Sequence, residues 1–317
     1  MSNCIDGVTG ETNIVDMWRN HYDTLLNSAT NDDHKGFVCD SLKQLCFNTG
    51  MYVSINEVID IVKELSTGKA TGMDGLNTES LKYADNLLCL LLSFCFTCMF
   101  KHSYMPHAML KSVIIPLVKN KCGDLSDKNN YRPIALSSIT SKVFEHLILQ
   151  RLEAYLWTND NQFGFKSGHS TDQCVYALSE FIEYYKSRST SIFVAFLDAS
   201  KAFDKINHWV LFKKLIDKHV PLFLVKILCF WYQQQSMYVR WGSTISTKFK
   251  VTNGVRQGGV LSPRLFNLYI DGLSTILNRC QIGGSIGGKR INHMLYADDI
   301  CVISLSSRGL QKTIVIL

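Results

Sequence analysis

The chain has 317 residues, 46% of them hydrophobic, which is enough to bury a core in one large or two ordinary domains and excludes a disordered chain. Its net charge of +6 favours an anionic partner only weakly, because the 33 basic residues are scattered among 27 acidic ones rather than clustered in a tail. The charge alone therefore does not identify a nucleic-acid-binding protein.

The cysteines and the N-terminus indicate where the protein acts. Eleven cysteines, irregularly spaced and mostly in apolar stretches, indicate reduced thiols. The N-terminus shows no basic start followed by an apolar stretch, so no secretory signal is visible. The most apolar run, residues 87–100, is too short to span a membrane and predicts a buried helix. We expect an intracellular protein of the nucleus, the cytoplasm or both, neither secreted nor associated with a membrane.

The first half of the chain predicts mainly helices. The amphipathic residues 14–26 belong to a helical lead-in that we expect over residues 1–55. Ser54 and Glu57 have the spacing of a capping box, which predicts a helix running to about residue 65. The elements expected next are a glycine-rich loop at 68–75, helices over roughly 78–101, a strand at 112–118, a polar loop to residue 131, and helices at roughly 140–157 and 170–187.

The final third predicts strands separated by helices. The expected elements are a strand at 192–197, a helix at about 205–217, a hairpin over 237–251 around Gly242, a helix at 263–278, and a second hairpin over 293–305. Because a hairpin pairs its strands antiparallel, we expect an α+β fold built on an antiparallel sheet.

Three aspartates lie at the ends of these strands. Asp198 ends the strand at 192–197, and Asp298 and Asp299 lie at the tip of the last hairpin. Ionised carboxylates that emerge from a sheet interior need a compensating charge, which a divalent cation supplies. Carboxylates that bridge two Mg²⁺ ions are a common arrangement for the attack of a hydroxyl on a phosphate. The alternative is that these residues are solvated turn aspartates and a helix N-cap.

A glycine-rich segment, residues 254–259, precedes Ser262 and Pro263, which are suited to begin a helix. Such a junction lets the backbone approach a planar base, and it can place N–H groups and Arg256 near phosphate oxygens. Alone, a glycine-rich loop is weak evidence for a nucleotide site.

Three basic residues surround the polar loop after the strand at 112–118, namely Lys119, Lys121 and Arg132. They form either a solvated basic loop or a clamp for a triphosphate, for which the guanidinium fork is well suited. The residues by themselves leave both interpretations open.

Six segments, taken in order, resemble the successive blocks of the reverse transcriptases of LINE-type (non-LTR) retrotransposons. They are Gly68–Gly75, Asn130–Ile134, Gln162–Thr171, Phe196–Asp204, Gly254–Gly259 and Tyr296–Asp299, the last reading Tyr-Ala-Asp-Asp. The resemblance covers about residues 55–305. It implies the right-hand fold, with fingers and palm-supporting helices at 56–190 and a palm at 191–317. We expect the palm to be C-terminally incomplete and the thumb to be absent.

The resemblance also implies roles for residues at matching positions. Asp198, Asp298 and Asp299 would be the catalytic, metal-binding carboxylates, with Mg²⁺ or alternatively Mn²⁺. The ring of Phe203 would exclude a ribose 2′-hydroxyl. The remaining deoxynucleotide contacts would come from Gln257 and Gly258 beneath the base and from Arg132 with either Lys119 or Lys121 on the triphosphate.

Contacts to the template or primer backbone are implied for a further set of residues. These are Lys69, Gln162, Gly164, Lys166, Ser170 and Arg256. Lys166 stands where the family usually has arginine, which keeps the charge but loses the planar fork.

The function implied is an RNA-directed DNA polymerase that extends a primer 3′-hydroxyl with deoxynucleoside triphosphates on an RNA template. The alternative is a catalytically weak or inactive nucleic-acid-binding remnant of such a polymerase. A group II intron maturase or a telomerase relative would share the carboxylates, but the blocks at 68–75 and 162–171 favour the LINE type. The sequence does not determine the oligomeric state.

Overall fold

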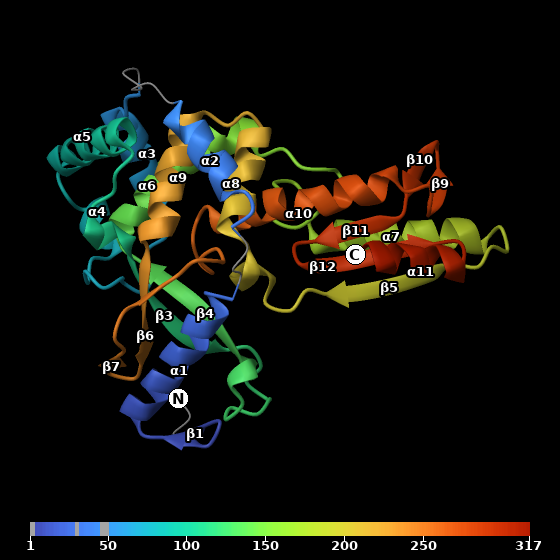
Figure 1. Cartoon of the computed structure of the whole chain (residues 1–317), viewed down its shortest axis with the longest axis horizontal. Helices are drawn as coiled ribbons and strands as arrows, with labels where there is room; N and C mark the ends of the chain where they lie inside the picture. The colour runs from blue at the N-terminus through green and yellow to red at the C-terminus, as the bar shows by residue number, and fades with distance from the viewer. Residues whose placement is uncertain (1–3, 29–31, 45–50) are drawn as a thin grey trace. The chain divides into compact units, whose positions relative to one another are not determined.

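The structure, a computed structural model, describes residues 4–28, 32–44 and 51–317. They form two compact units (Figure 1). The first takes the chain up to Tyr155 and then Phe203–Ser262, and the second consists of Leu156–Ala202 and Pro263–Leu317. The consecutive ranges expected for the lead-in, fingers and palm do not coincide with these units, and they remain an assignment by resemblance.

The first unit is built on a mixed sheet with strand order β4-β3-β6-β7 (Figure 1). A further strand, β8, pairs with the other end of β6. Most neighbours are antiparallel, but β3 and β6 are parallel, with Val113 opposite Tyr238. The sequence does not predict the parallel pairing of β3 with β6, because it joins two strands that are far apart in the sequence. The strands are β3 (Lys111–Val118), β4 (Tyr131–Ser137), β6 (Ser236–Trp241), β7 (Thr244–Ile245) and β8 (Phe249–Lys250).

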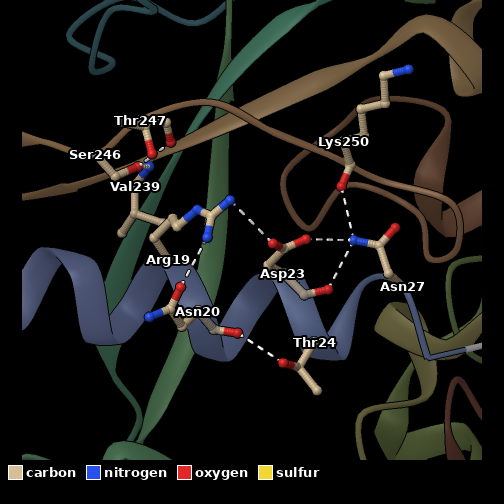
Figure 2. Close-up of polar contacts among 9 residues, drawn as sticks. All are labelled: Arg19, Asn20, Asp23, Thr24, Asn27, Val239, Ser246, Thr247 and Lys250. Atoms are coloured by element: carbon tan, nitrogen blue, oxygen red, sulfur yellow. Dashed lines mark hydrogen bonds and ion pairs between the residues drawn. The ribbon is translucent and has the colours of Figure 1, made fainter.

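The lead-in helix α1 (Glu11–Leu25) packs on this sheet, next to the small hairpin of β1 (Cys4–Ile5) and β2 (Val8–Thr9). Trp18 is fully buried, and its ring centroid lies 6.1 Å from that of Trp241 on β6. Just after the helix, a hydrogen bond connects the chain to β8 (Figure 2). Asn27 Nδ2 donates to the Lys250 carbonyl at 2.9 Å. The predicted amphipathic helix is therefore part of the core of the first unit.

The other helices of the first unit pack largely on one another. The capping box of Ser54 and Glu57 is confirmed at the start of α3. The helices expected over 78–101 are confirmed as two, α4 and α5, and Asp85 begins the second by accepting a hydrogen bond from Leu87 N. The helices are α2 (Lys35–Lys43), α3 (Ile55–Glu64), α4 (Thr78–Lys82), α5 (Asn86–His102), α6 (Ile139–Leu152), α8 (His208–Asp217) and α9 (Leu222–Gln234).

Helix α5 is confirmed, but its burial is only partial. Phe96 and Phe100 are only 1% exposed, whereas Leu87 and Leu91 are 59% and 54% exposed. A nearly uniform apolar run gave no indication of which side would face the solvent. No helix in the described ranges combines the length and the apolar composition needed to cross a membrane.

The second unit is built on an antiparallel sheet with strand order β11-β12-β5 (Figure 1). One face packs on α7, where Phe181 belongs to the same buried cluster as Met294 and Ile303. The other face packs on α10 and α11 through Leu295 and Val302. The elements are α7 (Thr171–Lys186), β5 (Phe193–Asp198), α10 (Ser262–Arg279), β9 (Gly284–Ile286), β10 (Lys289–Ile291), β11 (His293–Tyr296), β12 (Asp299–Ser304) and α11 (Ser307–Ile316). The predicted strand at 192–197 and the predicted hairpin over 293–305 are confirmed.

Candidate active site

The hairpin of β11 and β12 brings two of the three aspartates face to face in the second unit. Asp299, the first residue of β12, is the register partner of Asp198, the last residue of β5. Directly opposed residues in an antiparallel pair have Cβ atoms roughly 5 Å apart on the same face of the sheet. The sheet thus fixes two like charges next to each other at the end of its strands.

The tip of this hairpin consists of Ala297 and Asp298, between the paired residues Tyr296 and Asp299. Ala297 has φ of 57°, in the left-handed region that residues other than glycine rarely occupy. The surrounding contacts must therefore maintain this conformation of Ala297, and with it the position of Asp298, which follows directly.

The carboxylates are not buried as expected. Asp198 and Asp299 are exposed and Asp298 is half-buried, because all three lie where the strands end rather than within the sheet. The demand for a positive charge at this site comes instead from the repulsion between two opposed carboxylates.

The opposed pair is suited to Mg²⁺. Mg²⁺ prefers oxygen ligands and is commonly bound by one or two carboxylates, with water and substrate phosphates completing its shell. In the part of the chain that the structure describes, no three His, Cys, Asp or Glu side chains converge into a site that could hold a metal ion alone. Metal binding at this site remains a prediction, and it rests on the opposed pair of Asp198 and Asp299.

In the first unit, the glycine-rich segment after β8 brings Phe203 and Gln257 together. Val255 N donates to the Phe203 carbonyl at 2.9 Å, and Gln257 Nε2 donates to Asp204 Oδ1 at 2.9 Å. The Gln257 carbonyl in turn accepts from Ala135 N on β4 at 2.8 Å. These bonds join residues 203–204 to residues 255–257, and they join Gln257 to the edge strand β4.

Gly258 lies against the same edge of β4. Its φ is 100°, and a Cβ atom there would lie 3.3 Å from the Ala135 carbonyl oxygen and 3.6 Å from Ile134 Cγ2. The absence of a side chain lets the backbone of Gly258 lie close to β4. Its place beneath a base remains a prediction.

The basic residues lie where β3 ends and β4 begins. Arg132 is exposed on β4 opposite Leu117 of β3, and Lys119 continues β3, with its N–H donating to the Asn130 carbonyl at 2.8 Å. Since residues 117 and 119 point to the same face, Lys119 and Arg132 are diagonal neighbours. Lys121 is exposed in the loop beyond. The register therefore favours Lys119 as the partner of Arg132.

Arg256 is not available for nucleic acid, contrary to the prediction. Its side chain is 6% exposed, and Nη2 lies 2.6 Å from Glu145 Oε1, where Glu145 is 1% exposed. The guanidinium also lies 4.4 Å from the Trp231 ring centroid, and Glu145 accepts hydrogen bonds from Val260 and Leu261 N–H. Arg256 therefore fixes the glycine-rich segment from inside. The sequence signal for a buried acid is that Glu145 stands alone among apolar residues at helical spacing.

The segment 162–170, also expected to touch template or primer, is largely occupied within the second unit. Gln162 is buried and bonds to the turn at Ala297, Gly164 is buried, and Lys166 Nζ donates to the Thr158 carbonyl at 3.1 Å. Burial lowers the pKa of Lys166. The contact expected for the Gln162 side chain is thus replaced by a bond to the chain itself.

Two residues of the template set remain at the surface. Ser170 is exposed, although its hydroxyl forms a capping box with Gln173 at the start of α7. Lys69 is exposed in a loop of the first unit, where Gly72 packs closely on the backbone of Ser137. Their contacts with nucleic acid remain predictions.

Comparison with known proteins matches the chain to a family. The family described as "Reverse transcriptase (RNA-dependent DNA polymerase)" matches residues 118–317. The probable RNA-directed DNA polymerase from transposon X-element of Drosophila melanogaster is 32% identical over 78% of this chain and 26% of its own length.

Two further relatives come from other mobile elements. The RNA-directed DNA polymerase from mobile element jockey of Drosophila funebris is 29% identical over 82% of this chain and 28% of its own length. The Pol polyprotein from the type-1 retrotransposable element R2 of Nasonia vitripennis is 25% identical over 80% of this chain and 24% of its own length. The chain spans about a quarter of the length of these relatives.

Proposed function

Since the chain belongs to the reverse transcriptase family, with relatives in non-LTR retrotransposons, we propose that it is the fingers and palm core of an RNA-directed DNA polymerase. It would extend a primer 3′-hydroxyl with deoxynucleoside triphosphates on an RNA template. The observation that carries the proposal is the register pair of Asp198 and Asp299 beside Asp298 at a hairpin tip.

The carboxylates would bind the metal and orient the reacting groups. Mg²⁺, or alternatively Mn²⁺, held by Asp198, Asp298 and Asp299 would supply the Lewis acidity that activates a hydroxyl and neutralises phosphate charge. Asp198 and Asp299 would fix its position, since their backbone is held by the paired strands β5 and β12. Asp198 on β5 and Asp299 on β12 are exposed, so a primer end would reach them.

The residues beside β4 would select and hold the nucleotide. The Arg132 guanidinium would donate to triphosphate oxygens and stabilise the charge that develops on them, with Lys119 as a second cation. Gln257 and Gly258 would lie beneath the base. The Phe203 ring would occupy the position that a ribose 2′-hydroxyl needs, and so favour deoxynucleotides.

The nucleic-acid contacts would be to the sugar-phosphate backbone. Lys69 is exposed on its loop and can neutralise a phosphate without reading sequence. Ser170 is also exposed and lies at the start of α7. Such contacts would position the strands without reading their sequence.

Primer extension on an RNA template tests the proposal. The chain should incorporate deoxynucleotides in the presence of Mg²⁺, and Asp298→Asn should abolish extension, because the amide keeps the shape but removes a metal-binding charge. Asp172→Asn, at an exposed aspartate on the first turn of α7, is the matched control and should extend normally.

The outcomes separate this function from a non-catalytic remnant. Extension by neither the unaltered chain nor Asp298→Asn would contradict an enzyme and leave nucleic-acid binding as the function of the chain. Equal extension by both would contradict the assignment of the site.

A further inference from the structure

We propose that Gln162 is a positioning residue that holds the turn carrying Asp298. Its side chain is 1% exposed, and Oε1 accepts from Ala297 N at 3.0 Å. Its Nε2 donates to the Ala297 carbonyl at 3.4 Å. One amide group therefore bonds both backbone polar groups of the residue that directly precedes Asp298.

The turn requires such a partner. Ala297 is 5% exposed and has φ of 57°, so it is a buried residue in a disfavoured backbone conformation. It lies between Tyr296 and Asp299, the last register pair of the two strands. A buried N–H without a partner is unfavourable, and the Gln162 side chain supplies the acceptor.

Gln162 is itself held firmly beside β11. Phe163 N donates to the Leu295 carbonyl and Leu295 N donates to the Asn161 carbonyl, each at 2.8 Å, which adds a short parallel bridge to the sheet. Gln162 Oε1 also accepts from Gly164 N at 2.9 Å. The backbone around Gln162 is therefore fixed by its bonds to Leu295, and the side-chain oxygen is fixed by its bond from Gly164 N.

Gly164 completes the contact. A Cβ atom on this residue would lie 2.2 Å from Ala297 N, which is impossible without moving the turn. The Gly164 carbonyl accepts from Asn267 Nδ2 on α10 at 2.7 Å, so the segment cannot move away easily. Gln162 and Gly164 thus determine together how closely this segment approaches the turn and where the turn lies.

The inference rests on the proposed function only for its consequence in catalysis. If the carboxylates act as proposed, a displaced turn will misplace Asp298 and slow the chemical step, while nucleotide binding beside β4 will not change. The bond itself can be measured in a chain without activity.

Gln162→Met tests the bond, because methionine has a similar length but neither accepts nor donates as the amide does. Hydrogen exchange of the Ala297 amide should accelerate about tenfold or more. Exchange in β5 should stay the same, and Gln162→Glu, which keeps the acceptor oxygens, should restore most of the protection. Gln281→Met, at an exposed glutamine in the second unit, is the matched control.

Two further measurements test whether a displaced turn affects the carboxylates. Mn²⁺ affinity, measured by electron paramagnetic resonance, should fall in Gln162→Met, and kcat for primer extension should fall while KM for the deoxynucleotide stays within about twofold. Unaltered protection of Ala297 in a folded Gln162→Met chain would overturn the inference.

If Gln162→Met does not fold, the unaltered chain still decides the question. Cross-relaxation between the Gln162 side-chain amide protons and Ala297 supports the bond, and its absence overturns it. Failure of the unaltered chain to extend primers would contradict the proposed function alone, because neither amide exchange nor cross-relaxation depends on activity.

Discussion

The Arg256 guanidinium and the Glu145 carboxylate form a buried ion pair, with Nη2 and Oε1 2.6 Å apart, behind the glycine-rich segment of the first unit. Both side chains are nearly inaccessible to water, and the other Glu145 oxygen accepts from the Val260 and Leu261 N–H groups. The pair links α6 to the loop that carries Gln257, so its loss should affect both stability and the nucleotide site.

Glu145→Ala should lower the free energy of unfolding by about 3–5 kcal/mol, because it leaves the Arg256 charge buried without a partner. Urea denaturation followed by circular dichroism measures the change. Asp40→Ala, which breaks the exposed pair with Lys43, is the control and should have little effect. A similar small effect of Glu145→Ala would show that the buried pair is not structurally important.

Gly254→Ala should destabilise the first unit strongly. Gly254 has φ of 85°, and an added Cβ atom would lie 2.8 Å from the Asp204 carbonyl oxygen, which is backbone and cannot easily move. The strain and the clash together should lower the free energy of unfolding by about 2–4 kcal/mol.

Gly68→Ala separates the two effects in the same denaturation experiment. Gly68 also has a positive φ, 69°, but an added Cβ atom would meet nothing within 4 Å. Gly68→Ala should lower the free energy of unfolding by about 1 kcal/mol, from backbone strain alone. Equal losses for the two variants would argue against the clash.

Acidification should destabilise the fold, because His208 is buried in its neutral form. Its Nε2 lies 2.8 Å from the Gly254 carbonyl oxygen, and burial lowers the pKa of the ring from 6.5 to about 4. The unfolded chain therefore takes up a proton before the folded chain does. The contribution of His208 is complete above pH 6.5 and declines as the pH falls towards 4.

Urea denaturation at several pH values between about 7.5 and 4.5 should show a loss on the order of 1–3 kcal/mol from this group. His208→Gln, which can still donate to the Gly254 carbonyl, should reduce the pH dependence without removing it. Burial also lowers the pKa of His293 to about 4, and this second group should account for part of the remainder. An unchanged pH dependence in His208→Gln would contradict the role of His208.

Arg132→Met should raise the KM for deoxynucleoside triphosphates about tenfold or more, because a charged bidentate donor is lost. Lys119→Met should raise it less. Lys121→Met should leave it nearly unchanged, since the strand register makes Lys119 and not Lys121 the diagonal neighbour of Arg132. Steady-state primer extension measures the three values, and a larger effect at Lys121 would reverse the assignment.

Phe203→Ala should admit ribonucleotides. The ratio of kcat/KM for deoxynucleotides to that for ribonucleotides should fall by about tenfold to a hundredfold, because the ring no longer excludes the 2′-hydroxyl. Extension with single nucleotides of each kind measures the ratio. The value for deoxynucleotides alone is the internal control, and an unchanged ratio would make Phe203 a packing residue.

The elements that were predicted correctly have a clear local pattern. The strand that ends at Asp198 and the hairpin with Ala297 at its tip have apolar runs flanked by turn residues, and the structure contains both. Helix α9 was not predicted, because its run from Leu222 is apolar on nearly every side and has no helical period. Strand β4 was not predicted, because Pro133 and a polar start concealed it.

The same distinction applies to the candidate site. Asp198, Asp298 and Asp299 could be found because their residue type and order are visible in the sequence. The bond from Gln162 to Ala297 joins residues 135 positions apart, and no local pattern predicts it. The parallel pairing of β3 with β6 is equally non-local.

The interleaving of the two units along the chain limits how they can be exchanged between related genes. The first unit ends at Tyr155 and resumes at Phe203, while the second fills the gap and resumes at Pro263. A single crossover between the start of the second unit and the end of the first therefore leaves at least one unit with segments from two parents. One crossover cannot pass one unit whole from one parent and the other unit whole from a second, so each such event tests the internal packing of a unit.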